Sequence, residues 1–194
     1  MPTKLAEIDQ MTIDEFLAFT DERPSGERWE LIEGVPIMNP SPTNWHQVIC
    51  GNVYMALGQV KAVGGAAWVP ALGTGTRVPV SPRSLPQPDV MVVPGIGDQA
   101  TPVIDDALVI FEVLSRSNTR ADQAWRRKVY ASVPNCRHYV TVHASSVAVV
   151  RYDRDGGWGK AADLTSLDDE LRLPALGAAL PLTQLYQWTP LGRR

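Results

Sequence analysis

The chain has 194 residues, of which 44% are hydrophobic and 20% charged. This balance suits a globular protein with a buried core and excludes a disordered chain. The formal net charge of -3 excludes a molecule that is basic throughout, so any contact with nucleic acid must use a local basic patch.

Local sequence signals predict alternating helices and strands along the chain. The segment from Thr12 to Glu15 has the form of a capping box, which predicts the start of a short helix. Glu33-Gly34 predicts a turn between two strands. Longer helices are predicted from about Asn44 to Val63 and from Thr119 to about Val133. Further strands are predicted at residues 66–72, 75–80, 89–93, 107–114, 137–143 and 146–152, with a last strand near Trp158 and C-terminal leucines closing the edge of the core.

This order of elements predicts an α/β fold with a mixed β-sheet flanked by helices. The sequence contains no internal repeat and no low-complexity linker, so residues 1–194 are expected to form one domain. No apolar run approaches the roughly 20 residues of a membrane helix, and the N-terminus lacks a segment of signal-peptide type. Cys50 and Cys136 have no metal-type spacing and are expected to be buried free thiols, which favours a cytoplasmic protein.

Two carboxylates stand out in the strand-rich middle of the chain. Glu112 interrupts the most apolar predicted strand, and Asp89 opens another. A buried charge needs a partner, and two carboxylates on neighbouring strands can share Mg²⁺, which prefers oxygen ligands. Their carboxyl groups are then expected to lie about 4 to 6 Å apart. The alternative is that Glu112 forms an ion pair with an arginine or lysine.

An ordered set of motifs resembles a known family. The motifs are Trp29-Glu-Leu-Ile-Glu-Gly34, the His46 after Pro-Ser-Pro, Pro88-Asp89-Val-Met-Val-Val, Phe111-Glu-Val-Leu-Ser115, Lys128-x-Tyr130 and the strand that follows Cys136. Together they resemble the Uma family of restriction-endonuclease-like proteins, within the PD-(D/E)XK nuclease superfamily. The resemblance runs from about Met11 to Leu185. It implies a restriction-endonuclease-like fold and a metal-dependent endonuclease that hydrolyses DNA with Mg²⁺ as its cofactor.

The resemblance also implies roles for particular residues. Asp89 and Glu112 match the metal-binding pair, and the carbonyl of Val113 is a further candidate ligand. The superfamily carries a lysine two residues after the glutamate, but Leu114 stands there in this chain. The resemblance implies that Lys128, on the next predicted helix, replaces it in positioning or activating water. The alternative is that Lys128 is a solvated surface residue.

Glu30 and His46 each allow two interpretations. Glu30 matches an early glutamate of the family and would orient a metal-bound water, or it is an outward-facing strand residue. His46 lies near the start of a predicted helix and would contact phosphate or carry a proton, although a structural histidine is favoured.

A basic cluster surrounds the proposed site and favours DNA as partner, unless it is a solvated helix face: Arg116, Arg120, Arg126, Arg127, Lys128 and Arg137. A homodimer is expected, because cleavage of both strands needs two sites and two-fold dimers are the commonest assembly.

Two rival functions stay open. One is an inactive nuclease fold that binds nucleic acid or protein, and the other is a structural protein that buries an Asp–Glu–Lys network.

Overall fold

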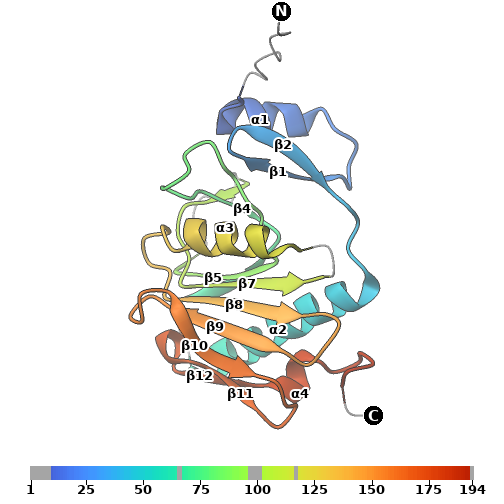
Figure 1. The fold of residues 1–194 in the computed structure, drawn as a ribbon, viewed down its shortest axis with the longest axis vertical. Coiled ribbons are helices and arrows are strands. Elements are labelled where there is room, and N and C mark those ends of the chain that lie inside the picture. The colour runs from blue at the N-terminus through green and yellow to red at the C-terminus, as the bar shows by residue number, and fades with distance from the viewer. Residues whose placement is uncertain (1–9, 65–66, 96–101, 116–117, 193–194) are drawn as a thin grey trace, which may run out of the picture.

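The computed structural model describes residues 10–64, 67–95, 102–115 and 118–192, and it confirms a mixed α/β fold (Figure 1). Its centre is a six-stranded sheet in the order β10-β9-β8-β7-β5-β3. The pair β7–β8 is parallel, and the other neighbours in this sheet are antiparallel. The strands are β3 (Val69–Leu72), β5 (Val90–Val93), β7 (Val109–Leu114), β8 (His138–His143), β9 (Val149–Asp153) and β10 (Gly159–Leu164).

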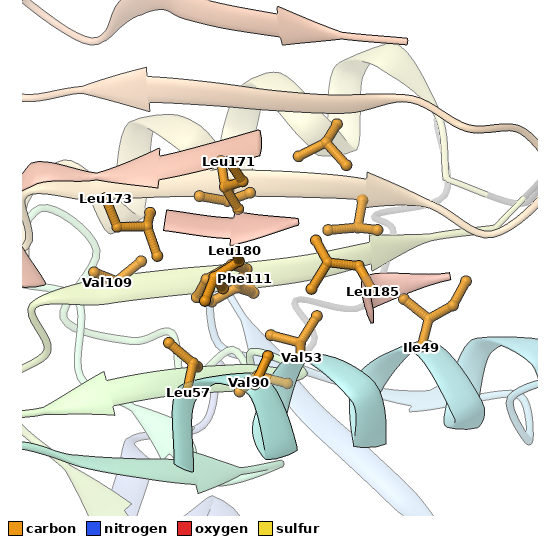
Figure 2. Packing of buried hydrophobic residues seen from close by; sticks show 14 of the residues in the cluster. Ile49, Val53, Leu57, Val90, Val109, Phe111, Leu171, Leu173, Leu180 and Leu185 are labelled. Carbon is orange, nitrogen blue, oxygen red and sulfur yellow. The ribbon is translucent and has the colours of Figure 1, made fainter. Parts of the chain in front are cut away.

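One face of the sheet is covered by α2 (Asn44–Gly64) together with a C-terminal hairpin and helix. Ile49, Val53 and Leu57 recur along α2 and point toward Phe111 and its neighbours on the sheet (Figure 2). The hairpin consists of β11 (Glu170–Leu173) and β12 (Ala178–Pro181), which flank a short 3-10 helix, η1 (Pro174–Leu176), and precede α4 (Leu182–Leu185). Leucines of these C-terminal elements complete the same hydrophobic cluster, as the sequence led us to expect.

The opposite face is covered by α3 (Arg120–Tyr130), which buries Val129 and Tyr130 against it. The hydroxyl of Thr119 caps this helix by accepting a hydrogen bond from the Asp122 amide at 3.1 Å. Because α2 and α3 lie on opposite faces, the strands between them are apolar on both sides, and every residue of β7 is buried. None of the helices in the described part of the chain has both the length and the apolar character needed to span a bilayer.

The N-terminal part forms a smaller cluster above the sheet (Figure 1). It contains α1 (Ile13–Asp21) and the antiparallel hairpin of β1 (Arg28–Ile32) and β2 (Val35–Asn39). Two short strands, β4 (Gly75–Thr76) and β6 (Val103–Ile104), pair in parallel nearby. A backbone bridge between Leu31 and Leu85 joins the hairpin to the chain segment that leads into β5. This bridge places β1 close to the beginning of β5.

Several predicted elements are longer than the observed ones. The strand predicted at residues 75–80 shrinks to β4, because Val78 and Ser81 close a turn with a 2.9 Å backbone hydrogen bond. The helix predicted to reach about Val133 ends at Tyr130, because Ser132 and Val133 donate to carbonyls three residues earlier, as in turns. The hairpin β11–β12 was not predicted as strands. Both cysteines are buried free thiols, as expected.

Gly34 is expected to be essential for the hairpin between β1 and β2. Its φ is +81°, and a Cβ at this position would lie 2.6 Å from the Cβ of Gln10. We expect Gly34→Ala to lower the free energy of unfolding by about 1–3 kcal/mol, from backbone strain and this contact. Gly58→Ala is the matched control, because Gly58 lies in α2 with open space around it and should gain about 0.5–1 kcal/mol. Urea denaturation of both variants tests the difference, and equal stabilities would contradict it.

Candidate functional site

Asp89 and Glu112 are brought together by the register of two neighbouring strands. Val90 of β5 pairs with Phe111 of β7, and Met91 pairs with Ile110. Carried one residue further, this register places Asp89 opposite Glu112. Directly opposed residues in an antiparallel pair lie on the same face, with Cβ atoms about 4.5–5.5 Å apart. The carboxylate of Asp89 also accepts a hydrogen bond from the Val113 amide at 2.8 Å, which fixes Asp89 against β7.

Arg126 of α3 is the cation that meets Glu112. Its Nη1 donates to Oε1 of Glu112 at 3.0 Å, and the hydroxyl of Tyr130 donates to the same oxygen at 2.6 Å. In the described part of the chain, the second oxygen, Oε2 of Glu112, accepts no hydrogen bond. The ion pair between Glu112 and an arginine, which the sequence allowed as the alternative, is therefore present. It uses Oε1 of Glu112 and does not involve Oε2.

Glu30 of β1 is buried in the same network, which excludes the outward-facing interpretation. Nη1 and Nη2 of Arg126 donate to its two oxygens at 3.1 and 2.7 Å. Glu30 also accepts from the Gln87 amide at 2.6 Å and from Nδ2 of Asn39 at 3.0 Å. With four donors, Glu30 is saturated. Both of its oxygens are therefore occupied by donors of the protein itself.

The network separates the pKa values of its two glutamates. Burial opposes the charge of Glu30, but Arg126 and the Gln87 and Asn39 donors hold its pKa below the ordinary value. Burial raises the pKa of Glu112 to about 8; Arg126 and Tyr130 oppose this, while the charges of Asp89 and Glu30 add to it. Burial disfavours the charge of Arg126, yet its acidic neighbours raise its pKa. Arg126 therefore stays charged, and Glu112 is the carboxyl group of the network that gains or loses a proton near neutral pH.

Two further side chains contact Asp89 from outside the network. Nε2 of His46 lies 3.3 Å from Oδ2 of Asp89, and Nη2 of Arg28 lies 3.8 Å from Oδ1. His46 is placed by the first turn of α2, where the hydroxyl of Thr43 accepts a hydrogen bond from its amide at 3.3 Å. The histidine is buried. The imidazole is therefore held against the carboxylate of Asp89.

A pocket of about 690 Å³ opens onto these groups. Its acidic and basic lining residues are three carboxylates, two guanidinium groups and one imidazole: Glu30, Asp89, Glu112, Arg28, Arg126 and His46. Part of its rim is apolar, with Trp45 46% exposed. When all are ionised, the acidic and basic groups of the lining are equal in number. The features that suit a cation are therefore the neighbouring carboxyl groups of Asp89 and Glu112, and not the overall charge of the pocket.

Lys128 is not brought to the carboxylates. It is exposed on α3 and does not belong to the described lining of the pocket. The expectation that Lys128 points back at the acidic pair is corrected, because Arg126, two residues earlier, takes that position. Leu114 is buried in β7. The catalytic role expected for Lys128 stays a prediction without a geometric basis.

Several residues of the predicted basic cluster have partners within the protein. Arg126 is buried in its ion pairs, the guanidinium of Arg127 lies 4.7 Å from the ring centre of Tyr152, and Arg137 pairs with Asp155 at 3.5 Å. Arg116 lies outside the described residues. The residues that sequence reasoning missed are Arg28, Asn39, Gln87 and Tyr130, which were not assigned to the site, and Arg126 as the partner of both glutamates.

The mixed sheet with helices on both faces is an α/β fold of the restriction-endonuclease-like type. The sequence profile of the Uma2 family, described as "Putative restriction endonuclease", matches residues 13–183. The chain belongs to the Uma2 family. A crystal structure from Anabaena variabilis, described as a "putative nuclease belonging to DUF820", has the same fold with a TM-score of 0.72 and 16% sequence identity. That match covers 92% of this chain and 98% of the other. None of the curated proteins compared with the chain matches it.

Proposed function

We propose that this protein is a Mg²⁺-dependent endonuclease that hydrolyses phosphodiester bonds of DNA. The observation that carries the proposal is the acidic pair: Asp89, immediately before β5, and Glu112, on β7, line one pocket. Membership of the Uma2 family supports nuclease chemistry. The metal, the substrate and the residue roles below are part of the proposal.

The side chains present fit a hard divalent cation. Mg²⁺ is bound through carboxylate oxygens and retains several waters. Asp89 offers Oδ1, whose nearest cationic neighbour is Arg28 at 3.8 Å, and Glu112 offers Oε2, which carries no hydrogen bond within the described chain. Glu30 does not fit as a ligand, because Arg126, Asn39 and Gln87 occupy its oxygens. Asp89 and Glu112 would thus hold the ion.

The residues around Asp89 and Glu112 would orient the carboxyl groups and balance their charge. When bound, Mg²⁺ acts as a Lewis acid toward a phosphate oxygen and promotes ionisation of water. Arg126 and Tyr130 both donate to Oε1 of Glu112, which fixes the carboxyl group and leaves Oε2 for the ion. Arg126 cannot serve as a base, because a guanidinium does not deprotonate in proteins. Its role is to position the glutamates.

Arg28 and Trp45 suit contact with the substrate. The Arg28 side chain is 32% exposed beside Asp89, so its guanidinium is available to a phosphate oxygen. The exposed Trp45 ring at the rim offers a surface on which a base stacks. DNA remains the proposed partner on this basis. The homodimer, the single domain over residues 1–194 and the cytoplasmic location stay predictions.

Cleavage of supercoiled plasmid tests the proposal. We expect the wild-type protein to nick or linearise plasmid in Mg²⁺ and to lose this activity in EDTA. Asp89→Asn and Glu112→Gln should each reduce the rate at least about a hundredfold, because each removes a metal ligand. Asp163→Asn is the matched control, since Asp163 is half-exposed on β10 and pairs with Lys160. The absence of Mg²⁺-dependent cleavage on supercoiled, linear and single-stranded DNA would refute the proposal.

Lys128→Ala belongs in the same assay, because it separates the sequence-based role from the geometry. If Lys128 activates water, this variant loses cleavage while it remains folded. The exposed position of Lys128 predicts an unchanged rate.

A second candidate function is a nuclease fold that binds nucleic acid without cutting it. The specific observation in its favour is Arg126, which neutralises Glu112 where the superfamily resemblance led us to expect a lysine. This candidate predicts DNA binding that is insensitive to EDTA and to Glu112→Gln. Electrophoretic mobility shift with and without Mg²⁺ distinguishes it from the endonuclease.

A further inference from the structure

A second group of metal-ligating side chains shares Asp89 with the acidic pair. His46 and Cys50 are four residues apart in α2, so both project from one face of the helix. The Cys50 sulfur lies 3.5 Å from Nδ1 of His46, and Nε2 of His46 lies 3.3 Å from Oδ2 of Asp89. The three residues form a contiguous chain of sulfur, nitrogen and oxygen ligands.

These ligand atoms are close enough for one ion. With a single atom taken from each residue, all three lie within 4.8 Å of one another. A tetrahedral ion with bonds of about 2.0–2.3 Å requires ligand atoms roughly 3.5 Å apart. Closing the group requires His46 to present one nitrogen to both neighbours. In the present geometry Nδ1 faces Cys50 and Nε2 faces Asp89, so binding of one ion by all three residues requires the imidazole ring to turn.

The ligand types select a metal other than Mg²⁺. Imidazole, thiolate and carboxylate are the three ligand types of Zn²⁺ sites, and three protein ligands leave one position open. Mg²⁺ takes oxygen ligands, and a thiolate selects softer ions. The side chains of His46 and Asp89 are 11% and 9% exposed, and Cys50 is 6% exposed, so the group is shielded from bulk water. His46 and Asp89 line the pocket, which gives an ion a way in.

A nucleophilic thiol is the other chemistry that this arrangement suggests, because the histidine lies between the cysteine and the aspartate. Two observations argue against it. Cys50 is 6% exposed and does not belong to the described lining of the pocket, so its sulfur is a poor position for attack on a substrate there. Burial also raises the pKa of the thiol, which keeps it protonated in the absence of a metal. Metal binding is the better supported chemistry.

We propose that His46, Cys50 and Asp89 bind a thiophilic divalent cation of the Zn²⁺ class, and that this ion inhibits the nuclease by occupying Asp89. On binding, a sulfur–metal bond forms and the thiol proton passes to solvent. The inhibitory part rests on the proposed function, because it assumes that Asp89 also holds Mg²⁺. The binding part does not depend on it.

Cobalt binding tests the site without any measurement of activity. Co²⁺ bound to a thiolate gives a sulfur-to-metal charge-transfer absorption, which we expect on titration of the wild-type protein with one equivalent of Co²⁺. Cys50→Ser should lose this absorption, and Cys136→Ser, the matched control at the other buried cysteine, should retain it. Absence of the absorption in the wild type, or its persistence in Cys50→Ser, would overturn the site. Circular dichroism confirms that each variant is folded.

Zinc affinity and inhibition complete the test. In competition with a chromophoric chelator, Cys50→Ala and His46→Ala should bind Zn²⁺ at least about tenfold more weakly than the wild type. Zn²⁺ at equimolar concentration should suppress cleavage by the wild type in excess Mg²⁺, and Cys50→Ala should resist it. Equal inhibition of both proteins would overturn the regulatory proposal. If no cleavage occurs at all, the endonuclease proposal fails, while the cobalt and chelator results still decide the metal site.

Discussion

Arg126→Ala is expected to lower the free energy of unfolding by about 3–5 kcal/mol at neutral pH. The Arg126 side chain is 11% exposed and donates to Glu30, Glu112 and Asp122. Its removal leaves two buried carboxyl groups without a cation, and such a group costs far more than a lost surface ion pair. Urea denaturation monitored by circular dichroism measures the loss.

The pH dependence of Arg126→Ala provides a second check. Without Arg126, the pKa values of both glutamates rise in the folded state. A carboxyl group with a raised pKa binds more protons when folded than when unfolded, so stability falls as pH rises. The difference in the free energy of unfolding between Arg126→Ala and the wild type should therefore be smaller at pH 5 than at neutral pH. Lys128→Ala, from the exposed side of the same helix, should change stability by less than about 0.5 kcal/mol. If Arg126→Ala lowers the free energy of unfolding by less than about 1 kcal/mol, Arg126 does not stabilise the two glutamates as proposed.

Affinity for Mg²⁺ is expected to rise about tenfold per pH unit below pH 8 and to level off above it. The pKa of Glu112 is raised to about 8, mainly by burial. A metal ligand must be deprotonated, so below this pKa each added unit of pH increases the competent fraction about tenfold. Isothermal titration calorimetry between pH 6 and 9 measures the affinity. Buffers of different ionisation enthalpy report the proton released on binding.

Glu112→Gln is the control for this dependence. The amide does not titrate, so the variant should bind Mg²⁺ weakly and with little change between pH 6 and 8. An equal affinity of the wild type at pH 6 and pH 8 would show that Glu112 is already ionised or is not a ligand.

The parts of the fold that local sequence signals determine were predicted well. Thr12 and Glu15 form both hydrogen bonds of the capping box, and Glu33-Gly34 forms the turn of the β1–β2 hairpin with positive φ at both residues. These structures depend on residues a few positions apart. The hairpin β11–β12 was missed, because Leu171 and Leu173 alternate with polar residues over only four positions. Short strands of this kind become stable through packing on a distant surface.

The helix periodicity of the sequence could have predicted that Arg126, and not Lys128, would face Glu112. Val129, Tyr130 and Val133 are buried and follow Arg126 by three, four and seven residues, which is the spacing of one helix face. Lys128 does not lie on this face and is exposed. Lys128 was predicted from its residue type, whereas the structure brings Arg126 to Glu112 because Arg126 lies on the buried face of α3.

The opposition of Asp89 and Glu112 was expected but not derivable from the sequence, because a shift of one residue in the pairing of β5 and β7 would have separated the two side chains. The proximity of His46 and Cys50 to Asp89 also depends on how α2 packs. Such contacts join distant segments, and no local pattern specifies them.

The ion pair between Glu30 and Arg126 joins residues 96 positions apart in the chain. During synthesis, the β1–β2 hairpin emerges from the ribosome long before α3. Until then the carboxylate of Glu30 can accept hydrogen bonds from Asn39 and Gln87 but has no cation from α3. The charge of this buried carboxylate is therefore balanced only once α3 has been made, so the network of the pocket cannot be complete before that point.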